Sequence, residues 1–173
     1  MLPGISLILG GAASGKTAFA ENLAASTGRG PVYLATAQIT DEEMRAKIDR
    51  HRKSRGSGWR TLEEPMDAGR ALAAIGGDNV VLMDCATMWL SNRMLAGHDC
   101  GEAEAELMAG LSLCAAPVVI VSNEVGNSIV PENALAREFR EAQGRLNQKL
   151  AAKAGLVVQV VAGLPMVLKG HLP

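Results

Sequence analysis

The sequence predicts an α/β fold in which a mostly parallel sheet carries helices on both faces. Short runs of Val, Ile and Leu recur along the chain, and segments of helical character separate them. The runs are almost continuously apolar, which is typical of strands buried on both faces of a parallel sheet. Their alternation with helices indicates right-handed crossovers in a layered architecture. With 173 residues, we expect residues 1–173 to form a single domain.

The apolar runs and the segments between them give the expected elements. Strands are expected over residues 5–9, 32–35, 80–83, 118–121 and 156–161, and helices over 16–25, 41–55, 66–75, 102–113 and 133–154. The last helix carries Leu135, Phe139, Leu146 and Leu150 at close to helical spacing, which is typical of a face that packs on the core. We expect the tail beyond Leu168 to fray.

Composition and charge exclude several classes of protein. The formal net charge is −1, so no basic surface indicates a nucleic-acid partner. No apolar run approaches the ~20 residues that a transmembrane helix needs. The cysteines, Cys85, Cys100 and Cys114, are odd in number and lack the spacing of metal ligands. We therefore expect free thiols and a cytoplasmic protein.

A glycine-rich loop follows the first expected strand and opens the first expected helix. Residues 10–17 match the phosphate-binding pattern Gly-x4-Gly-Lys-Thr in the context that the pattern requires. Its glycines let several N–H groups converge, and the helix N-terminus adds partial positive charge. Lys16 would reach the β- and γ-phosphates, and Thr17 would offer a hydroxyl to Mg²⁺. We favour a P-loop NTPase-like nucleotide-binding domain over a chance glycine-rich turn. The expected nucleotide-binding residues of the loop are Gly10, Gly11, Ala12, Ala13, Ser14, Gly15, Lys16 and Thr17.

A P-loop needs a second group to orient its metal ion, and Asp84 is the candidate. It follows Val-Val-Leu-Met at the carboxyl end of an expected strand, where ligands gather in open α/β sheets. An Asp at a strand end can also simply cap the next element. The metal site is the favoured interpretation.

The expected helix over 41–55 ends in a strongly basic turn that contains His51. The cations match the helix dipole, so stabilisation of the helix C-terminus accounts for them. The alternative is a second clamp for nucleotide phosphates with His51 as a nucleophile. The residues by themselves favour the first interpretation.

Longer motifs change that balance. The sequence reads ATAQ at 35–38, DEEMRAKIDRHRKSR at 41–55, WRTLEEP at 59–65, MDCATMWLSN at 83–92, SNEVGNSIVPENALAREFRE at 122–141, GRLNQKLAAKA at 144–154 and VVAGLPMVLK at 160–169. With GGAASGKT at 10–17, these motifs resemble the bifunctional adenosylcobinamide kinase / adenosylcobinamide-phosphate guanylyltransferase family of cobalamin biosynthesis. The resemblance covers about residues 5–169, and the segment 122–148 is far more specific than the P-loop.

The resemblance implies an enzyme with two activities. The first phosphorylates the aminopropanol hydroxyl of adenosylcobinamide with ATP or GTP. The second transfers GMP from GTP onto that phosphate through a guanylyl-histidine on the helix after the second strand. His51 is the only histidine in that expected helix and is therefore the candidate carrier. Mg²⁺ and a homo-oligomer, expected to be a trimer, are also implied. Outside the P-loop, the resemblance suggests nucleotide contacts from Ala35, Thr36, Ala37, Arg52, Lys53, Ser54, Arg55, Glu63 and Asp84, with Thr17 and Asp84 at the metal and Lys16 and His51 as catalytic residues.

Two alternatives to a bifunctional enzyme remain open from the sequence. Certain relatives carry two adjacent histidines where this chain has Arg50 and His51, which leaves a kinase without guanylyltransferase activity as an alternative. A GTP-binding switch is a third possibility, although no Asn-Lys-x-Asp motif for reading guanine occurs. Asn123 and Glu124 are candidates for orienting substrate or metal.

The arginines of the last helix and the two tryptophans carry less specific expectations. Arg137, Arg140 and Arg145 interleave with glutamates, so we expect a solvated, salt-bridged face. Trp59 and Trp89 could contact a corrinoid ring or fill the core, and core filling is favoured for Trp89.

Overall fold

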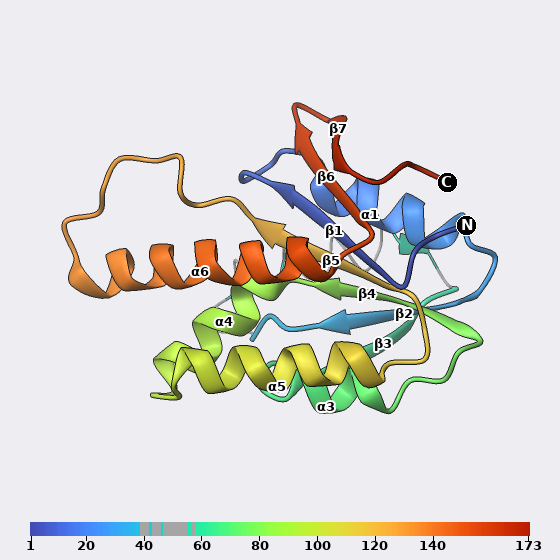
Figure 1. Ribbon diagram of the computed structural model, residues 1–173, viewed down its shortest axis with the longest axis horizontal. Helices are drawn as coiled ribbons and strands as arrows, with labels where there is room; N and C mark the ends of the chain where they lie inside the picture. The colour runs from blue at the N-terminus through green and yellow to red at the C-terminus, as the bar shows by residue number, and fades with distance from the viewer. Residues whose placement is uncertain (39–41, 43–45, 47–54, 57) are drawn as a thin grey trace.

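The computed structural model describes residues 1–38, 42, 46, 55, 56 and 58–173. The described strands are β1 (Ile5–Gly10), β2 (Gly30–Ala35), β3 (Arg60–Glu63), β4 (Asn79–Asp84), β5 (Val118–Asn123), β6 (Leu156–Val161) and β7 (Leu164–Lys169). The described helices are α1 (Lys16–Ala25), α3 (Ala68–Ala73), α4 (Ala86–Leu95), α5 (Cys100–Leu113) and α6 (Ala134–Lys153). The strands form one seven-stranded sheet in the order β3-β2-β4-β5-β1-β6-β7 (Figure 1).

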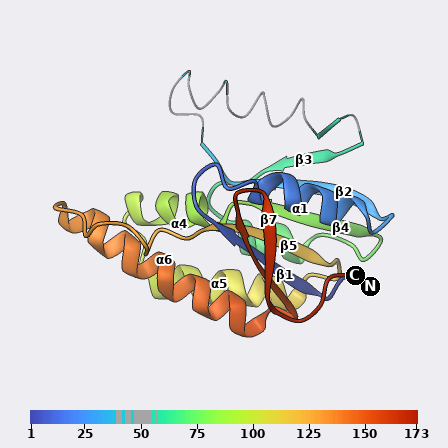
Figure 2. The ribbon, with the colours of Figure 1, turned by 90° about the horizontal axis from the view of Figure 1, so that it is seen from above.

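The sheet is parallel except at one edge, and the described helices cover both of its faces. β7 is the exception, since it pairs antiparallel with β6. Figure 2 shows α1 on one side of the sheet and α4, α5 and α6 on the other. The expected α/β architecture, with a mostly parallel sheet between helices, is therefore confirmed.

Alternation along each strand divides the core into two clusters. One cluster packs under α3, α4, α5 and α6 and includes Leu7 and Ile120 from the central strands. The other packs under α1 and includes Ile8 and Val121. Both clusters are fully buried at the centre, as the continuous apolar runs predict for strands covered on both faces.

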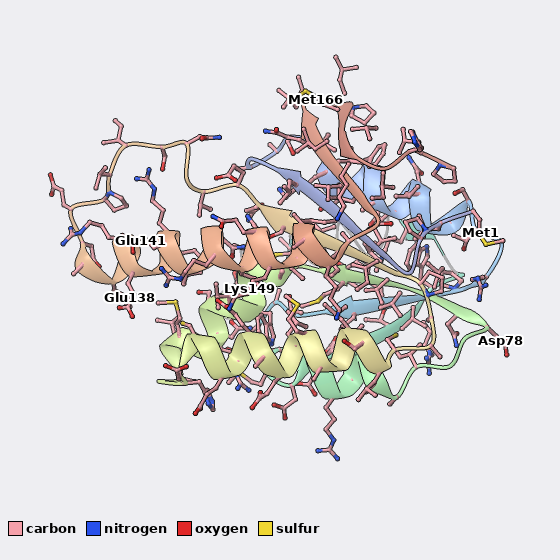
Figure 3. The ribbon with its side chains drawn as sticks, in the orientation of Figure 1. Met1, Asp78, Glu138, Glu141, Lys149 and Met166 are labelled. Carbon is pink, nitrogen blue, oxygen red and sulfur yellow. The ribbon has the colours of Figure 1, made fainter. Side chains whose placement is uncertain are left out.

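α6 is fixed to the neighbouring helices as well as to the sheet. Leu146 and Leu150 lie in the core cluster shared with α4 and α5, which confirms the packing face expected from their spacing. Lys149 reaches from α6 toward α5 and pairs with the buried carboxylate of Glu104 (Figure 3). α6 therefore contacts both the core under the sheet and α5, and the segment after β5 leads into its N-terminus.

Three described elements differ from the expected set. The expectation lacked β3, a four-residue strand whose residues are all exposed, and β7, which follows β6 after a tight turn. It also lacked α4, which begins directly after Cys85. The expected helix over 41–55 lies mostly outside the described residues. None of the helices that the structure describes has the length and hydropathy needed to span a bilayer.

Candidate active site

Five neighbouring strands end together at the carboxyl edge of the sheet. In sheet order from β3 to β1, their last residues are Glu63, Ala35, Asp84, Asn123 and Gly10. Ala35 is in register with both Glu63 and Asp84, and Gly10 is in register with Asn123. Ligands of α/β sheets bind outside this edge. Residues that the sequence analysis selected separately therefore converge on one site.

The glycine loop connects β1 to α1 with the geometry of a phosphate-binding loop. Gly15 adopts the left-handed region, at φ 90° and ψ 3°, directly before the first turn of α1. Ala13 is also left-handed, at φ 55°, a conformation that costs a residue with a Cβ about 1 kcal/mol or more. The Lys16 ammonium donates to the carbonyl oxygen of Gly11 at 2.9 Å, so it lies across the loop. The loop thus presents backbone N–H groups, a helix N-terminus and an ammonium at one place.

The turn between β6 and β7 packs against the phosphate loop. The N–H of Gly163 donates to the carbonyl oxygen of Ser14 at 2.8 Å. A Cβ on Gly15 would lie 3.1 Å from the Gly163 Cα, so a side chain at residue 15 would crowd the backbone of the turn. The β6–β7 hairpin therefore supports the phosphate loop, a role that no pattern in the sequence indicates.

Asp84 shares one face of the sheet with the start of α1. Val80 and Leu82 pack in the cluster under α1, and the two-residue period of a strand places Asp84 on the same face. The Tyr33 hydroxyl donates to Asp84 Oδ2 at 2.9 Å. Burial and the neighbouring Asp84 carboxylate raise the pKa of Tyr33 far above its usual range. The phenol therefore stays protonated and acts as a donor that fixes the Asp84 carboxylate.

Thr36 holds the backbone that follows Asp84. Its buried hydroxyl accepts from the Cys85 N–H at 2.7 Å and donates to the Cys85 carbonyl oxygen at 2.7 Å. Asn92 donates to the Thr36 carbonyl oxygen at 2.8 Å. Burial raises the pKa of the Cys85 thiol to about 11, so this thiol is neutral at physiological pH. The hydroxyl of Thr36 is thus committed to the protein, and its expected nucleotide contact stays a prediction.

The side chain of Arg55 is 3% exposed and packs against Tyr33. The Arg55 guanidinium carbon lies 3.3 Å from the Tyr33 ring centroid, and its Nη1 lies 3.9 Å from Glu21 Oε1. Burial raises the pKa of Glu21, while Arg55 acts in the opposite direction. Arg55 therefore connects the end of the basic segment to Tyr33, and through Tyr33 to Asp84.

Thr17 and Asp84 provide donors of the type that Mg²⁺ prefers. Both are oxygen ligands, one at the first turn of α1 and one at the end of β4. Among the described residues, no group of three or more His, Cys, Asp or Glu could hold a metal ion by itself. This composition fits a cation held by one or two protein oxygens and completed by substrate phosphates.

Other residues selected from the sequence are distributed around the edge. Glu63 is exposed at the end of β3, and Ala37 lies half-buried beyond β2. His51, Arg52, Lys53 and Ser54 lie outside the described residues. Trp89 is buried in the core and donates to the Met66 carbonyl oxygen at 2.9 Å, which confirms core filling. Trp59 packs edge-on against Tyr33 at 6.4 Å between ring centroids.

The solvated, salt-bridged face expected for the α6 arginines is confirmed in part: Arg137 and Arg145 are exposed, but only Arg145 forms an ion pair with a described residue. Arg145 pairs with Glu141 at 3.6 Å, as expected. Arg137 instead donates to the carbonyl oxygens of Pro131 and Glu132, and Arg140 donates to that of Gly126. The loop between β5 and α6 folds back over the helix N-terminus, so its carbonyls replace the glutamates as partners.

Several residues that build the site were missed from the sequence. Tyr33 lies inside an apolar run, where it reads as a core residue. Gln143 and Asn147 occupy the buried face of α6, one turn apart. Polar amides on an otherwise apolar helix face were the available indication, since buried polar groups require partners.

The chain is similar to known proteins over nearly its whole length. A family model described as cobinamide kinase / cobinamide phosphate guanyltransferase matches residues 6–168. The chain is 43% identical to the bifunctional adenosylcobalamin biosynthesis protein CobP of Pseudomonas aeruginosa, over 95% of this chain and 97% of that protein. It is 40% identical to the bifunctional adenosylcobalamin biosynthesis protein CobU of Escherichia coli, over 94% of this chain and 98% of that protein.

Similarity to solved structures is more distant. The RadB recombinase superposes with a TM-score of 0.48 at 16% identity, over 91% of this chain and 74% of that chain, a likeness too weak to bear on function. The family match spans nearly the whole chain and includes the P-loop, Asp84 and the β5–α6 segment. This chain therefore belongs to the cobinamide kinase / cobinamide phosphate guanyltransferase family.

Proposed function

We propose that this chain is a bifunctional enzyme of cobalamin biosynthesis. It phosphorylates the aminopropanol hydroxyl of adenosylcobinamide with ATP or GTP, and it then transfers GMP from GTP onto that phosphate. The observation that carries the proposal is the convergence of the P-loop, Asp84 and Asn123 at one sheet edge in a chain of this family. Residues 1–173 act as one domain in this proposal.

In the kinase step, the loop backbone and Lys16 bind the β- and γ-phosphates. Thr17 and Asp84 would hold Mg²⁺, which would neutralise charge on the phosphate oxygens. The acceptor hydroxyl oxygen forms a bond to the γ-phosphorus while the bond from that phosphorus to the β–γ bridging oxygen breaks. The hydroxyl proton leaves to solvent or a nearby base, and Tyr33 keeps the Asp84 carboxylate oriented throughout.

In the guanylyl step, His51 is the proposed nucleophile. A ring nitrogen bonds to the α-phosphorus of GTP, and the bond to the α–β bridging oxygen breaks, releasing pyrophosphate. A phosphate oxygen of adenosylcobinamide phosphate then forms the diphosphate linkage while the nitrogen–phosphorus bond breaks. Arg52, Lys53, Ser54 and Ala37 are proposed nucleotide contacts, and the neighbouring cations offset negative charge at the α-phosphate.

The kinase half is tested by product analysis. Protein, Mg²⁺, ATP and adenosylcobinamide are incubated, and corrinoid products are separated by chromatography and identified by mass. We expect adenosylcobinamide phosphate first, and adenosylcobinamide-GDP when GTP is added. Slow release of inorganic phosphate without any corrinoid product would instead favour a GTP-binding switch.

The guanylyl half is tested by covalent labelling. The protein is incubated with Mg²⁺ and GTP labelled at the α-phosphate, and then denatured. We expect retained label that is labile to acid and stable to alkali, and that is lost in His51→Asn. Absence of label under conditions in which GTP binds would contradict the covalent step and favour an enzyme with kinase activity only.

We also propose a cytoplasmic homo-oligomer, expected to be a trimer by family resemblance. The described cysteines, Cys85, Cys100 and Cys114, are all free, which suits a reducing compartment. β7 supports self-association, because it is an open sheet edge with exposed apolar side chains, including Met166 (Figure 3). Sedimentation equilibrium gives the subunit number, and a monomer at micromolar concentration would contradict the proposal.

A further inference from the structure

A buried network of polar side chains lies directly beneath the carboxyl end of β5. Ser122 Oγ donates to Asn147 Oδ1 at 2.6 Å, and Gln143 Nε2 donates to Ser122 Oγ and to Asn147 Oδ1, each at 2.9 Å. The Thr87 and Ser122 hydroxyl oxygens lie 3.5 Å apart. Ser122 and Gln143 are 0% exposed and Asn147 is 7% exposed, so these hydrogen bonds form away from water.

The network terminates on the backbone of Asn123. The Asn123 N–H donates to Thr87 Oγ1 at 2.8 Å, and the Asn123 carbonyl oxygen accepts from Asn147 Nδ2 at 3.1 Å. The next N–H, that of Glu124, donates to the Gly10 carbonyl oxygen at 3.1 Å. Both backbone groups of Asn123 are therefore fixed by side chains from two different helices, and the chain is then tied to the phosphate loop.

The side chain of Asn123 faces the phosphate loop rather than the network. Along β5, Val119 and Val121 pack in the cluster under α1, and the two-residue period places Asn123 on that face. β5 lies between β1, which leads into the loop, and β4, which ends at Asp84. Among the described residues, the Asn123 amide group has no hydrogen-bond partner, although both backbone groups of this residue are bonded. A half-buried amide lies between the phosphate-binding loop and the proposed metal ligand.

The energetics favour a functional role for this arrangement. Burying several amides and hydroxyls contributes less net stability than apolar packing, because each group first loses its hydrogen bonds to water. Connected buried hydrogen bonds instead restrict the groups that form them to one geometry. One buried atom of this network, Gln143 Oε1, has no hydrogen-bond partner among the described residues. In this network, the groups held in place are the N–H and the carbonyl oxygen of Asn123, at the carboxyl edge of the sheet.

We infer that the Asn123 amide donates to an oxygen of the nucleotide γ-phosphate, and that Asn147 and Thr87 are positioning residues that act through Asn123. The inference rests on the proposed function, since it concerns the group transferred in the kinase step. It distinguishes triphosphate from diphosphate, because only the triphosphate carries the oxygen that Asn123 contacts.

The test compares two nucleotides and does not require the corrinoid. Titration calorimetry with Mg²⁺ gives Kd for the non-hydrolysable ATP analogue AMP-PNP and for ADP. We expect Asn123→Ala to weaken AMP-PNP on the order of tenfold while Kd for ADP changes less than about twofold, as for loss of one hydrogen bond to a charged group. Asn147→Ala should produce a smaller change in the same direction.

The double variant Asn123→Ala/Asn147→Ala separates positioning from a structural role. If Asn147 acts through Asn123, the second substitution should have little further effect on the AMP-PNP to ADP ratio, so the two effects are not additive. Leu150→Ala is the matched control, because it removes a buried side chain from the next turn of α6 and leaves the network intact. It should lower the melting temperature without changing the ratio.

Thr87 gives a second pair of variants if Asn147→Ala does not fold. Thr87→Val removes the hydroxyl that accepts from Asn123, and Thr87→Ser retains it, so only the former should shift the ratio. Equal weakening of both nucleotides, an unchanged ratio, or additive effects in the double variant would each overturn the inference. The variants could shift the AMP-PNP to ADP ratio as expected while the wild-type protein fails to phosphorylate adenosylcobinamide. That outcome would overturn only the proposed function.

Discussion

The centre and the edge of the same sheet build their parts of the site in different ways. At the centre, Asp84 and Asn123 are held by partners from other elements, through Tyr33 at one residue and through Thr87 and Asn147 at the other. At the edge, β3 contributes Glu63, and every residue of that strand is exposed. The side chains and backbone groups at the ends of the central strands are therefore held in position before substrate binds. A residue on the edge strand, such as Glu63, gains a hydrogen-bond partner only from the ligand.

The difference matters because phosphoryl transfer depends on positioning. Groups that contact the transferred phosphoryl are effective when their orientation costs nothing at the moment of reaction. Water competes with the ligand for the hydrogen bonds of an exposed carboxylate, so each such bond contributes less to the free energy of binding. Substitutions at the centre should therefore affect turnover most, and substitutions at the edge should mainly affect selectivity between nucleotides.

The largest effect is expected at Lys16, whose ammonium lies over the loop. Lys16→Ala should reduce kcat for cobinamide phosphorylation by about 10²–10³, since one cationic donor to the transferred group is lost. Lys153→Ala is a matched control, because that lysine is on α6 and its ammonium donates to Ser112. Corrinoid product formation measures both variants, and a Lys16→Ala enzyme with undiminished kcat would contradict the assignment of the loop.

The second effect is expected where the β6–β7 turn supports the loop. Gly163 has φ 79° and Gly97 has φ 80°, so Ala at either position should cost about 1 kcal/mol of unfolding free energy. Only Gly163 bonds to Ser14, so we expect Gly163→Ala, and not Gly97→Ala, to weaken Mg²⁺–ADP binding several-fold. Equal nucleotide affinity in the two variants would show that the turn does not position the loop.

The P-loop could be recognised from the sequence, whereas the supporting role of the β6–β7 turn could not. The loop was recognisable because its chemistry demands particular residues at fixed spacing after a strand. The role of Gly163 was not, because it depends on β7 pairing antiparallel beside β6 and bringing a turn from the far end of the chain against Ser14. Local patterns identify groups that act on ligand, and long-range contacts determine which groups support them.

The same reasoning explains the secondary structure that was missed. Only Cys85 separates the end of β4 at Asp84 from the start of α4 at Ala86, so no turn residues mark the boundary. β3 is short and fully exposed, and it therefore lacks the apolar run that indicated the central strands. Gln143 and Asn147 were predicted as part of a helix, but their hydrogen bonds to β5 follow from tertiary packing.

The edge strand supplies a comparison between adjacent glutamates. The Glu64 carboxylate accepts from the N–H groups of Met66 and Asp67, at 3.0 and 2.8 Å, whereas the Glu63 carboxylate has no hydrogen bond to a described residue. Glu64→Ala should lower the unfolding free energy by about 1 kcal/mol, with nucleotide affinity unchanged. Glu63→Ala should leave stability unchanged and weaken GTP a few-fold relative to ATP. Calorimetric titration and chemical denaturation measure the two quantities, and identical GTP affinity would indicate that Glu63 is solvated in the complex.

The smallest effect concerns the reactivity of the three thiols. Cys85 is buried beside Asp84, whereas Cys100 and Cys114 are half-buried. Burial raises the pKa of all three thiols, and that of Cys85 to about 11, so the reactive thiolate is scarcer at pH 8 than in a free cysteine. Labelling by iodoacetamide should therefore accelerate as pH rises from 7 to 9. Cys100 and Cys114 are half-buried and should react in the native protein, whereas Cys85 should react only after denaturation. Peptide mass mapping distinguishes the three sites. Rapid native labelling of Cys85 would mean that the backbone beside Asp84 opens readily, and a carboxylate on a backbone that opens is not preorganised for metal or phosphate.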